Sequence, residues 1–115
     1  MKRAKFRHVH FPVFSYYCVH VEITPDIEKS LSKYPETRGI CPDHTSHADG
    51  VTVHVDDHGK DFIFLNPDCT PGVIAHEAWH SISRMLSYVG VDLDSETVAY
   101  HLGYLVDEIF KFAYK

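Results

Sequence analysis

The chain has 115 residues, of which 44% are hydrophobic and 23% charged, and its formal net charge is −5. This length suits one domain, and the composition excludes collagen-like, mucin-like and wholly disordered proteins. Histidine is the outlier, because ten residues are of this type and histidine is the commonest metal ligand in proteins.

The amino terminus is basic and the rest of the chain is acidic. Four of the eleven Lys and Arg residues precede residue 8, and the first acid is Glu22. We interpret residues 1–7 as a flexible basic segment of a single domain that spans residues 1–115. The acidic remainder argues against nucleic-acid binding, and no apolar run is long enough to span a membrane.

The expected compartment is the cytoplasm. The start of the chain lacks the apolar segment of a secretory signal. The three cysteines are an odd number without close pairs, which predicts free thiols in a reducing environment.

The first half of the chain predicts one strand and one short helix. Residues 13–24 are aromatic and β-branched, with the alternation of a half-buried strand. Thr24-Pro25 then suits the start of a short helix that ends before Pro35. Residues 35–50 have the composition of a loop.

The second half predicts a hairpin and two long helices. Residues 51–56 and 62–65 form the strands of the hairpin. One helix runs from Thr70-Pro71 to near Gly90, and the other begins near Ser95. The predicted fold is therefore α+β, with a small antiparallel or mixed sheet of about three strands, and two long helices and one short helix on one side of it.

The first long helix contains the pattern His-Glu-x-x-His at residues 76–80. The i, i+4 spacing places His76 and His80 on one helix face, where both can reach one Zn²⁺ at about 2.0–2.1 Å. Glu77 can reach a water held by the metal and act as general base. Because a histidine-rich chain produces this spacing by chance more often, a helix with two exposed histidines remains the alternative.

A catalytic zinc ion needs a third protein ligand and an open fourth position. We expect Glu96, in the first turn of the last helix, to fold back onto the histidine pair. Tyr100 and Gly103 share its helix face, and the missing side chain of Gly103 would let the two helices approach closely. The alternative is that Glu96 only interacts with the helix dipole.

These residues resemble the zincin metallopeptidases, and among them the gluzincins, through His76-Glu77-x-x-His80 followed by Glu96-x-x-Ala99. The resemblance implies one zinc ion per chain, held by His76, His80 and Glu96, with Glu77 as catalytic base. Tyr100 stands where the neprilysin branch has an acid that orients a ligand histidine. A contact with a histidine, a contact with substrate oxygen and simple packing remain open for it.

The resemblance also implies that a strand edge, at residues 51–56 or 62–65, binds an extended substrate by strand addition. No residues remain for the second subdomain of larger zincins, so we expect a shallow site. We predict a zinc-dependent metallopeptidase acting on a peptide or protein. The alternative is a zincin-like binding module with a structural zinc that acts on a host partner, because small proteins with this pattern also resemble phage or prophage products. The sequence does not indicate the oligomeric state.

Other candidate ligands carry weaker predictions. Cys41-x-x-His44-x-x-His47 has ligand types at ligand-like spacing, but we favour a solvated loop over a second metal site. His54 and His58 flank the hairpin turn, and we favour ordinary exposed histidines over a role at the zinc site. For Cys69 we favour an inert thiol over an inhibitory zinc ligand. Trp79 is expected to pack in the core.

Overall fold

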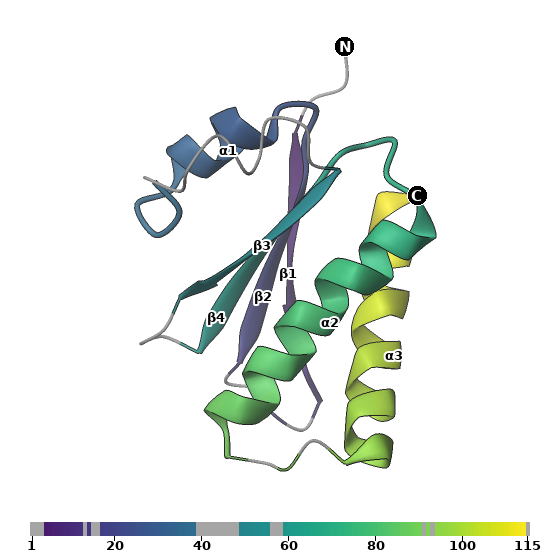
Figure 1. Cartoon of the computed structure of the whole chain (residues 1–115). Coiled ribbons are helices and arrows are strands. Elements are labelled where there is room, and N and C mark those ends of the chain that lie inside the picture. The colour runs from purple at the N-terminus through teal and green to yellow at the C-terminus, as the bar shows by residue number, and fades with distance from the viewer. Residues whose placement is uncertain are drawn as a thin grey trace.

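The computed structural model describes residues 4–12, 14, 17–38, 49–55, 59–90, 92 and 94–114. In chain order its elements are β1 (Lys5–His10), β2 (Cys18–Ile23), α1 (Ile27–Lys33), β3 (Gly50–Val55), β4 (Lys60–Leu65), α2 (Pro71–Tyr88) and α3 (Ser95–Ala113). The α+β class is confirmed, and Figure 1 shows the helices arranged around one sheet. No helix in the described ranges is long and apolar enough to cross a membrane.

The sheet has four strands in the order β1-β2-β4-β3, one more than the expected three. β1 pairs with β2 and β3 with β4 in antiparallel fashion, whereas β2 and β4 are parallel. The predicted hairpin is confirmed, with Val53 opposite Phe62. Among the described strands β3 pairs on one side only, so it is an edge of the sheet.

The additional strand is β1, which includes residues 5–7 of the segment that we expected to be flexible. Arg7 forms an ion pair with Glu108 of α3 at 3.0 Å, and Lys5 donates a hydrogen bond to the backbone oxygen of Phe112 at 3.1 Å. The sequence conceals this strand because its α3-facing side begins with two basic side chains. This part of the segment is therefore strand rather than flexible chain.

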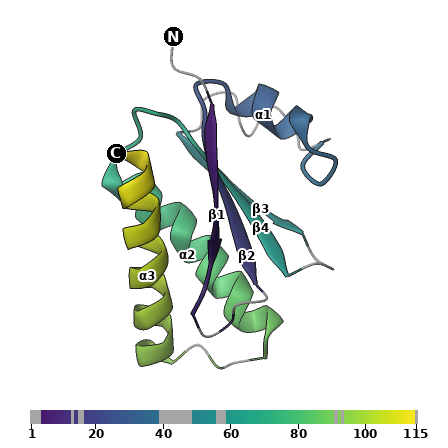
Figure 2. The ribbon, with the colours of Figure 1, turned by 180° about the vertical axis from the view of Figure 1, so that it is seen from behind.

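Helices cover both faces of the sheet, which corrects the expectation of helices on one side. α2 and α3 lie side by side on one face and α1 lies on the other (Figures 1 and 2). The reason is β4, where Phe62 and Phe64 pack with α1 and Ile63 and Leu65 join the core of α2 and α3. A strand that is apolar on both sides needs a layer on each.

The helix boundaries follow their caps. Thr70 caps α2 by accepting from Val73 N at 3.3 Å, and Gly90, with φ of +76°, follows its end, both as the sequence indicates. α1 is capped by Asp26, which accepts from Lys29 N at 3.0 Å, rather than by Thr24.

A buried carboxylate ties α1 to the sheet. Tyr34 donates to Glu22 at 2.5 Å and the Lys33 ammonium lies 3.2 Å away. Burial alone would raise the pKa of Glu22, but hydrogen bonds from Tyr34, Ser30 and Lys33 hold it below its usual value. Burial also lowers the pKa of the adjacent His20.

Both shifts predict acid destabilisation. The unfolded chain binds more protons than the folded chain, first below about pH 6.5 through His20 and then below about pH 4.3 through Glu22. The free energy of unfolding in urea should therefore fall on acidification, and Glu22→Gln should lose less between pH 5 and pH 3 than wild type. An equal loss in both proteins would contradict this role for Glu22.

Candidate active site

The helix α2 presents the His-Glu-x-x-His residues in two directions. Its buried face packs against the sheet through Ile74, Ala78, Ile82, Met85 and Leu86. His76 and His80 are exposed, whereas Glu77 is 7% exposed. One helical turn thus offers two imidazoles to solvent and turns the carboxylate between them toward the sheet.

The two imidazoles converge. The Nε2 atoms of His76 and His80 are 3.3 Å apart, and the rings lie edge to face. Two nitrogens that each lie about 2.0–2.1 Å from a tetrahedral zinc ion are about 3.3–3.4 Å apart. The observed spacing therefore fits two ligands of one ion. A hydrogen bond between two neutral imidazoles has a similar spacing, so the geometry fits zinc without requiring it.

The Glu77 carboxylate lies between α2 and the edge strand. Its Oε2 is 3.9 Å from His76 Nε2, and its Oε1 accepts a hydrogen bond from the Thr52 hydroxyl at 2.6 Å. The hydroxyl is also 3.2 Å from the backbone oxygen of Glu77. One carboxylate oxygen is thus held by the sheet and the other faces the histidine.

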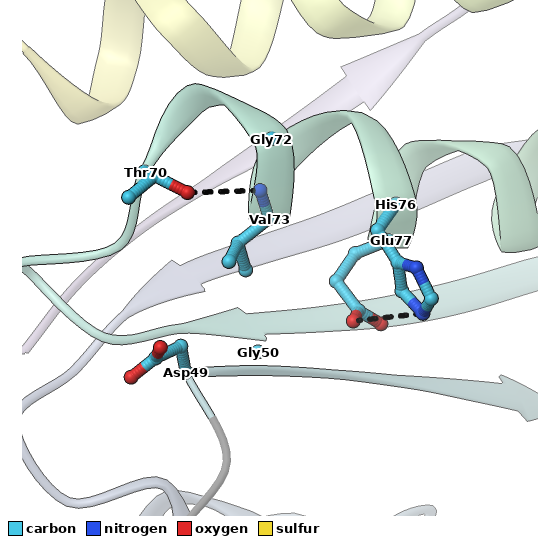
Figure 3. A pocket seen from close by; sticks show the side chains of 7 residues that line it. All are labelled: Asp49, Gly50, Thr70, Gly72, Val73, His76 and Glu77. Carbon is cyan, nitrogen blue, oxygen red and sulfur yellow. Dashed lines mark hydrogen bonds and ion pairs between the residues drawn. The ribbon is translucent and has the colours of Figure 1, made fainter.

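A pocket of about 420 Å³ adjoins these groups. It lies between the first turns of α2 and the start of β3, with His76 and Glu77 on one wall (Figure 3). The remaining lining residues are Asp49, Gly50, Thr70, Gly72 and Val73. The pocket therefore places space for a ligand next to the carboxylate and one imidazole.

β3 and α2 approach each other closely at Gly50. A Cβ atom at this position would lie 2.9 Å from Glu77 Cγ and 3.0 Å from Val73 Cγ1. Real Cβ atoms essentially never come closer than 3.0 Å to such neighbours. The absence of a side chain at Gly50 therefore allows the stem of Glu77 to lie against the strand.

The structure does not bring Glu96 to the histidine pair. Glu96 is exposed in the first turn of α3, and α3 begins beside the end of α2 (Figure 1). His80 precedes the last residue of α2 by eight positions, which is about 12 Å along the helix axis. Among the described residues no group of three His, Cys, Asp or Glu side chains could hold a metal ion. Glu96 as third ligand therefore gains no support from this geometry.

Three further expectations about the helices can be compared with the structure. Tyr100 is 54% exposed and its ring contacts His101, with ring centroids 5.0 Å apart. Gly103 is exposed, and a Cβ there would meet nothing within 4 Å, so it does not serve the helix contact as expected. Trp79 is 43% exposed rather than in the core, because α2 packs through other positions.

His54 of β3 lies on the same strand face as Thr52 and interacts with Asp61 of β4. His54 Nδ1 is 2.9 Å from Oδ1 of Asp61, whose carboxylate is fully buried. The side chain of His54 is 35% exposed. Burial and the neighbouring Asp61 also raise the pKa of Tyr17. His54 is thus exposed, as the sequence predicts, and Asp61 orients its ring.

The remaining candidates divide in two. Cys41, His44, His47 and His58 lie outside the described residues. Cys69 is buried, and burial together with the nearby Asp49 carboxylate raises the pKa of its thiol. This thiol is therefore held in the neutral form, in agreement with an inert cysteine.

Sequence reasoning missed Gly50, Thr52 and Asp61. The alternation of residues 51–55 already places Thr52 and His54 opposite the apolar face of the strand. The alternation predicts that Thr52 and His54 share one face of the strand. It does not predict which helix residue packs against that face.

Comparisons with family models, curated proteins and solved structures find no match for this chain.

The close approach at Gly50 predicts a stability difference between two glycine substitutions. Gly50→Ala should lower the free energy of unfolding by about 1–3 kcal/mol, because the new methyl group overlaps Glu77 and Val73. Gly103→Ala, at an exposed helix position, should raise it by about 0.5–1 kcal/mol. Urea unfolding of both variants checks this, and a neutral Gly50→Ala would show that β3 and α2 are not tightly packed there.

Proposed function

We propose that the protein is a zinc-dependent hydrolase of the metallopeptidase type, with His76 and His80 as two of the metal ligands and Glu77 as general base. The observation that carries this proposal is the 3.3 Å separation of the two Nε2 atoms next to the Glu77 carboxylate. The pocket beside them offers room for a substrate.

The residues of the chain supply the proton transfers. When bound, zinc would lower the pKa of a coordinated water and polarise a carbonyl group. Glu77 would take the proton of the attacking water on Oε2, the oxygen that Thr52 does not engage, and pass it to the leaving group.

A peptide substrate is favoured by the edge of β3 that is unpaired among the described strands. Asn66 N donates to Asp49 O at 2.8 Å, which makes this opposed pair a hydrogen-bonded one. Such pairs alternate along an antiparallel ladder, so residues 51, 53 and 55 bond to β4 and residues 50, 52 and 54 direct their backbone groups to the free edge. A peptide added there would run next to Glu77.

The ligand set is the first part of the proposal to test. Glu96 remains the third ligand that the sequence predicts, whereas the structure supports only the histidine pair. We expect purified wild type to bind about one zinc ion per chain, His80→Ala to lose most of this affinity, and Glu96→Gln to keep it within about threefold. Competition with a chromophoric chelator measures the affinities. A large loss in Glu96→Gln would instead support the ligand set of the gluzincin resemblance.

Hydrolysis is tested with Glu77→Gln, which keeps the size of the side chain and removes its basicity. We expect this variant to bind zinc like wild type and to lose about 100-fold or more in kcat on a peptide library. Equal hydrolysis by wild type and variant would exclude Glu77 as the base. If wild type binds zinc and cleaves nothing, the binding-module alternative replaces the hydrolase.

A further inference from the structure

The Glu77 carboxylate is largely removed from water, and the His-Glu-x-x-His pattern does not indicate which groups replace its lost hydration. The side chain is 9% exposed, and a carboxylate removed from water is costly unless donors replace the lost hydration. A flexible glutamate could satisfy this need in many orientations, few of which suit proton transfer beside His76. A partner on the sheet has to select one of them.

Thr52 provides this partner. Its hydroxyl carries one proton and has two acceptors within reach, Glu77 Oε1 at 2.6 Å and the backbone oxygen of Glu77 at 3.2 Å. The shorter contact is that to the charged oxygen, as expected for a charge-assisted hydrogen bond. The bond makes the two carboxylate oxygens unequal, because Oε1 is engaged and Oε2 faces His76.

The strand that carries Thr52 is well fixed. Thr52 lies opposite Ile63 of β4, and Ile63 is fully buried. The β-branched side chain of Thr52 has few rotamers. Two residues earlier, Gly50 lies opposite Leu65 and leaves space for the Cγ atom of Glu77. β3 thus contacts both the stem and the head of the same side chain.

The backbone N–H and C=O groups of Thr52 point to the edge of the sheet. Asp49 and Asn66 form a hydrogen-bonded pair and such pairs alternate along the ladder, so Thr52 falls at a position that does not bond to β4. A peptide that adds to this edge would bond to the backbone of the residue whose hydroxyl holds the base. Peptide and carboxylate would then be aligned by one rigid residue.

We propose that Thr52 is the positioning residue of the site: its hydroxyl holds Oε1 of Glu77 so that Oε2 accepts the proton of the attacking water. This inference rests on the proposed hydrolase function. It assigns a role to a strand residue that lies 25 positions before Glu77 in the chain.

The experiment compares Thr52→Val, which replaces the hydroxyl with a methyl group of similar size, with Thr52→Ser, which keeps the hydroxyl. In the zinc-loaded full chain we expect Thr52→Val to lower kcat about 10- to 100-fold, because the base loses its orientation. KM and the zinc content should stay within about twofold, and Thr52→Ser should recover most of kcat. Thr52→Ala provides a second deletion of the hydroxyl, and only variants with wild-type thermal unfolding are compared.

Ser81→Ala is the matched control. Ser81 is a buried hydroxyl one helical turn after Glu77, and its Oγ has no hydrogen-bond partner among the described residues. Its removal should leave kcat unchanged, so a loss specific to Thr52→Val is not a general effect of deleting a buried hydroxyl.

The outcomes separate the two proposals. Hydrolysis by wild type with unchanged kcat in Thr52→Val and Thr52→Ala overturns the role of Thr52 and leaves the hydrolase intact. Parallel changes in KM or zinc content, or a failure of Thr52→Ser to recover kcat, overturn it as well, since they indicate a structural effect. Absence of hydrolysis in wild type removes the hydrolase and the positioning role together.

Discussion

The strand β4 is the constraint on which the rest of the fold depends. None of its side chains from Asp61 to Leu65 is more than 1% exposed, so both of its faces have to be covered. One face requires α2 and α3, and the other requires α1. β4 also needs a strand on each side, which it obtains from β2 and from its hairpin partner β3. β3 consequently lies at the border of the sheet, where α2 crosses close to it at Gly50.

The candidate site follows from this border position. On the α2 face, β3 presents small or polar side chains rather than large apolar ones. Glu77 of α2 contacts this face through its hydrogen bond with Thr52. Two buried acids, Glu77 of α2 and Asp61 of β4, each have a partner on β3, which is Thr52 for Glu77 and His54 for Asp61. Hydrogen bonds to fixed partners give both buried carboxylates defined orientations.

The sequence predicts those features that depend on neighbours in the chain. The hairpin, the start of α2 at Thr70-Pro71 and the convergence of His76 and His80 all follow from short-range periodicity or capping. Features that depend on distant contacts were missed. β1 is hidden because Lys5 and Arg7 are held by α3, about a hundred residues away. The short connection between α2 and α3 predicts Glu96 beside the histidines, but α2 continues for eight residues past His80 before that connection begins.

The contact of β3 with Glu77 has a consequence for recognising related chains. A motif of five residues on one helix is weak evidence in a histidine-rich sequence, because such a composition produces the motif by chance more often. Gly50 and Thr52 add two positions on a separate element, at a separation set by the hairpin, the connection after β4 and the first two turns of α2. A chain that carries Gly-x-Thr in a strand, a hairpin return and then His-Glu-x-x-His at this distance satisfies a three-dimensional condition rather than a local one. The composite pattern would separate chains that form this site from chains that contain only the His-Glu-x-x-His motif.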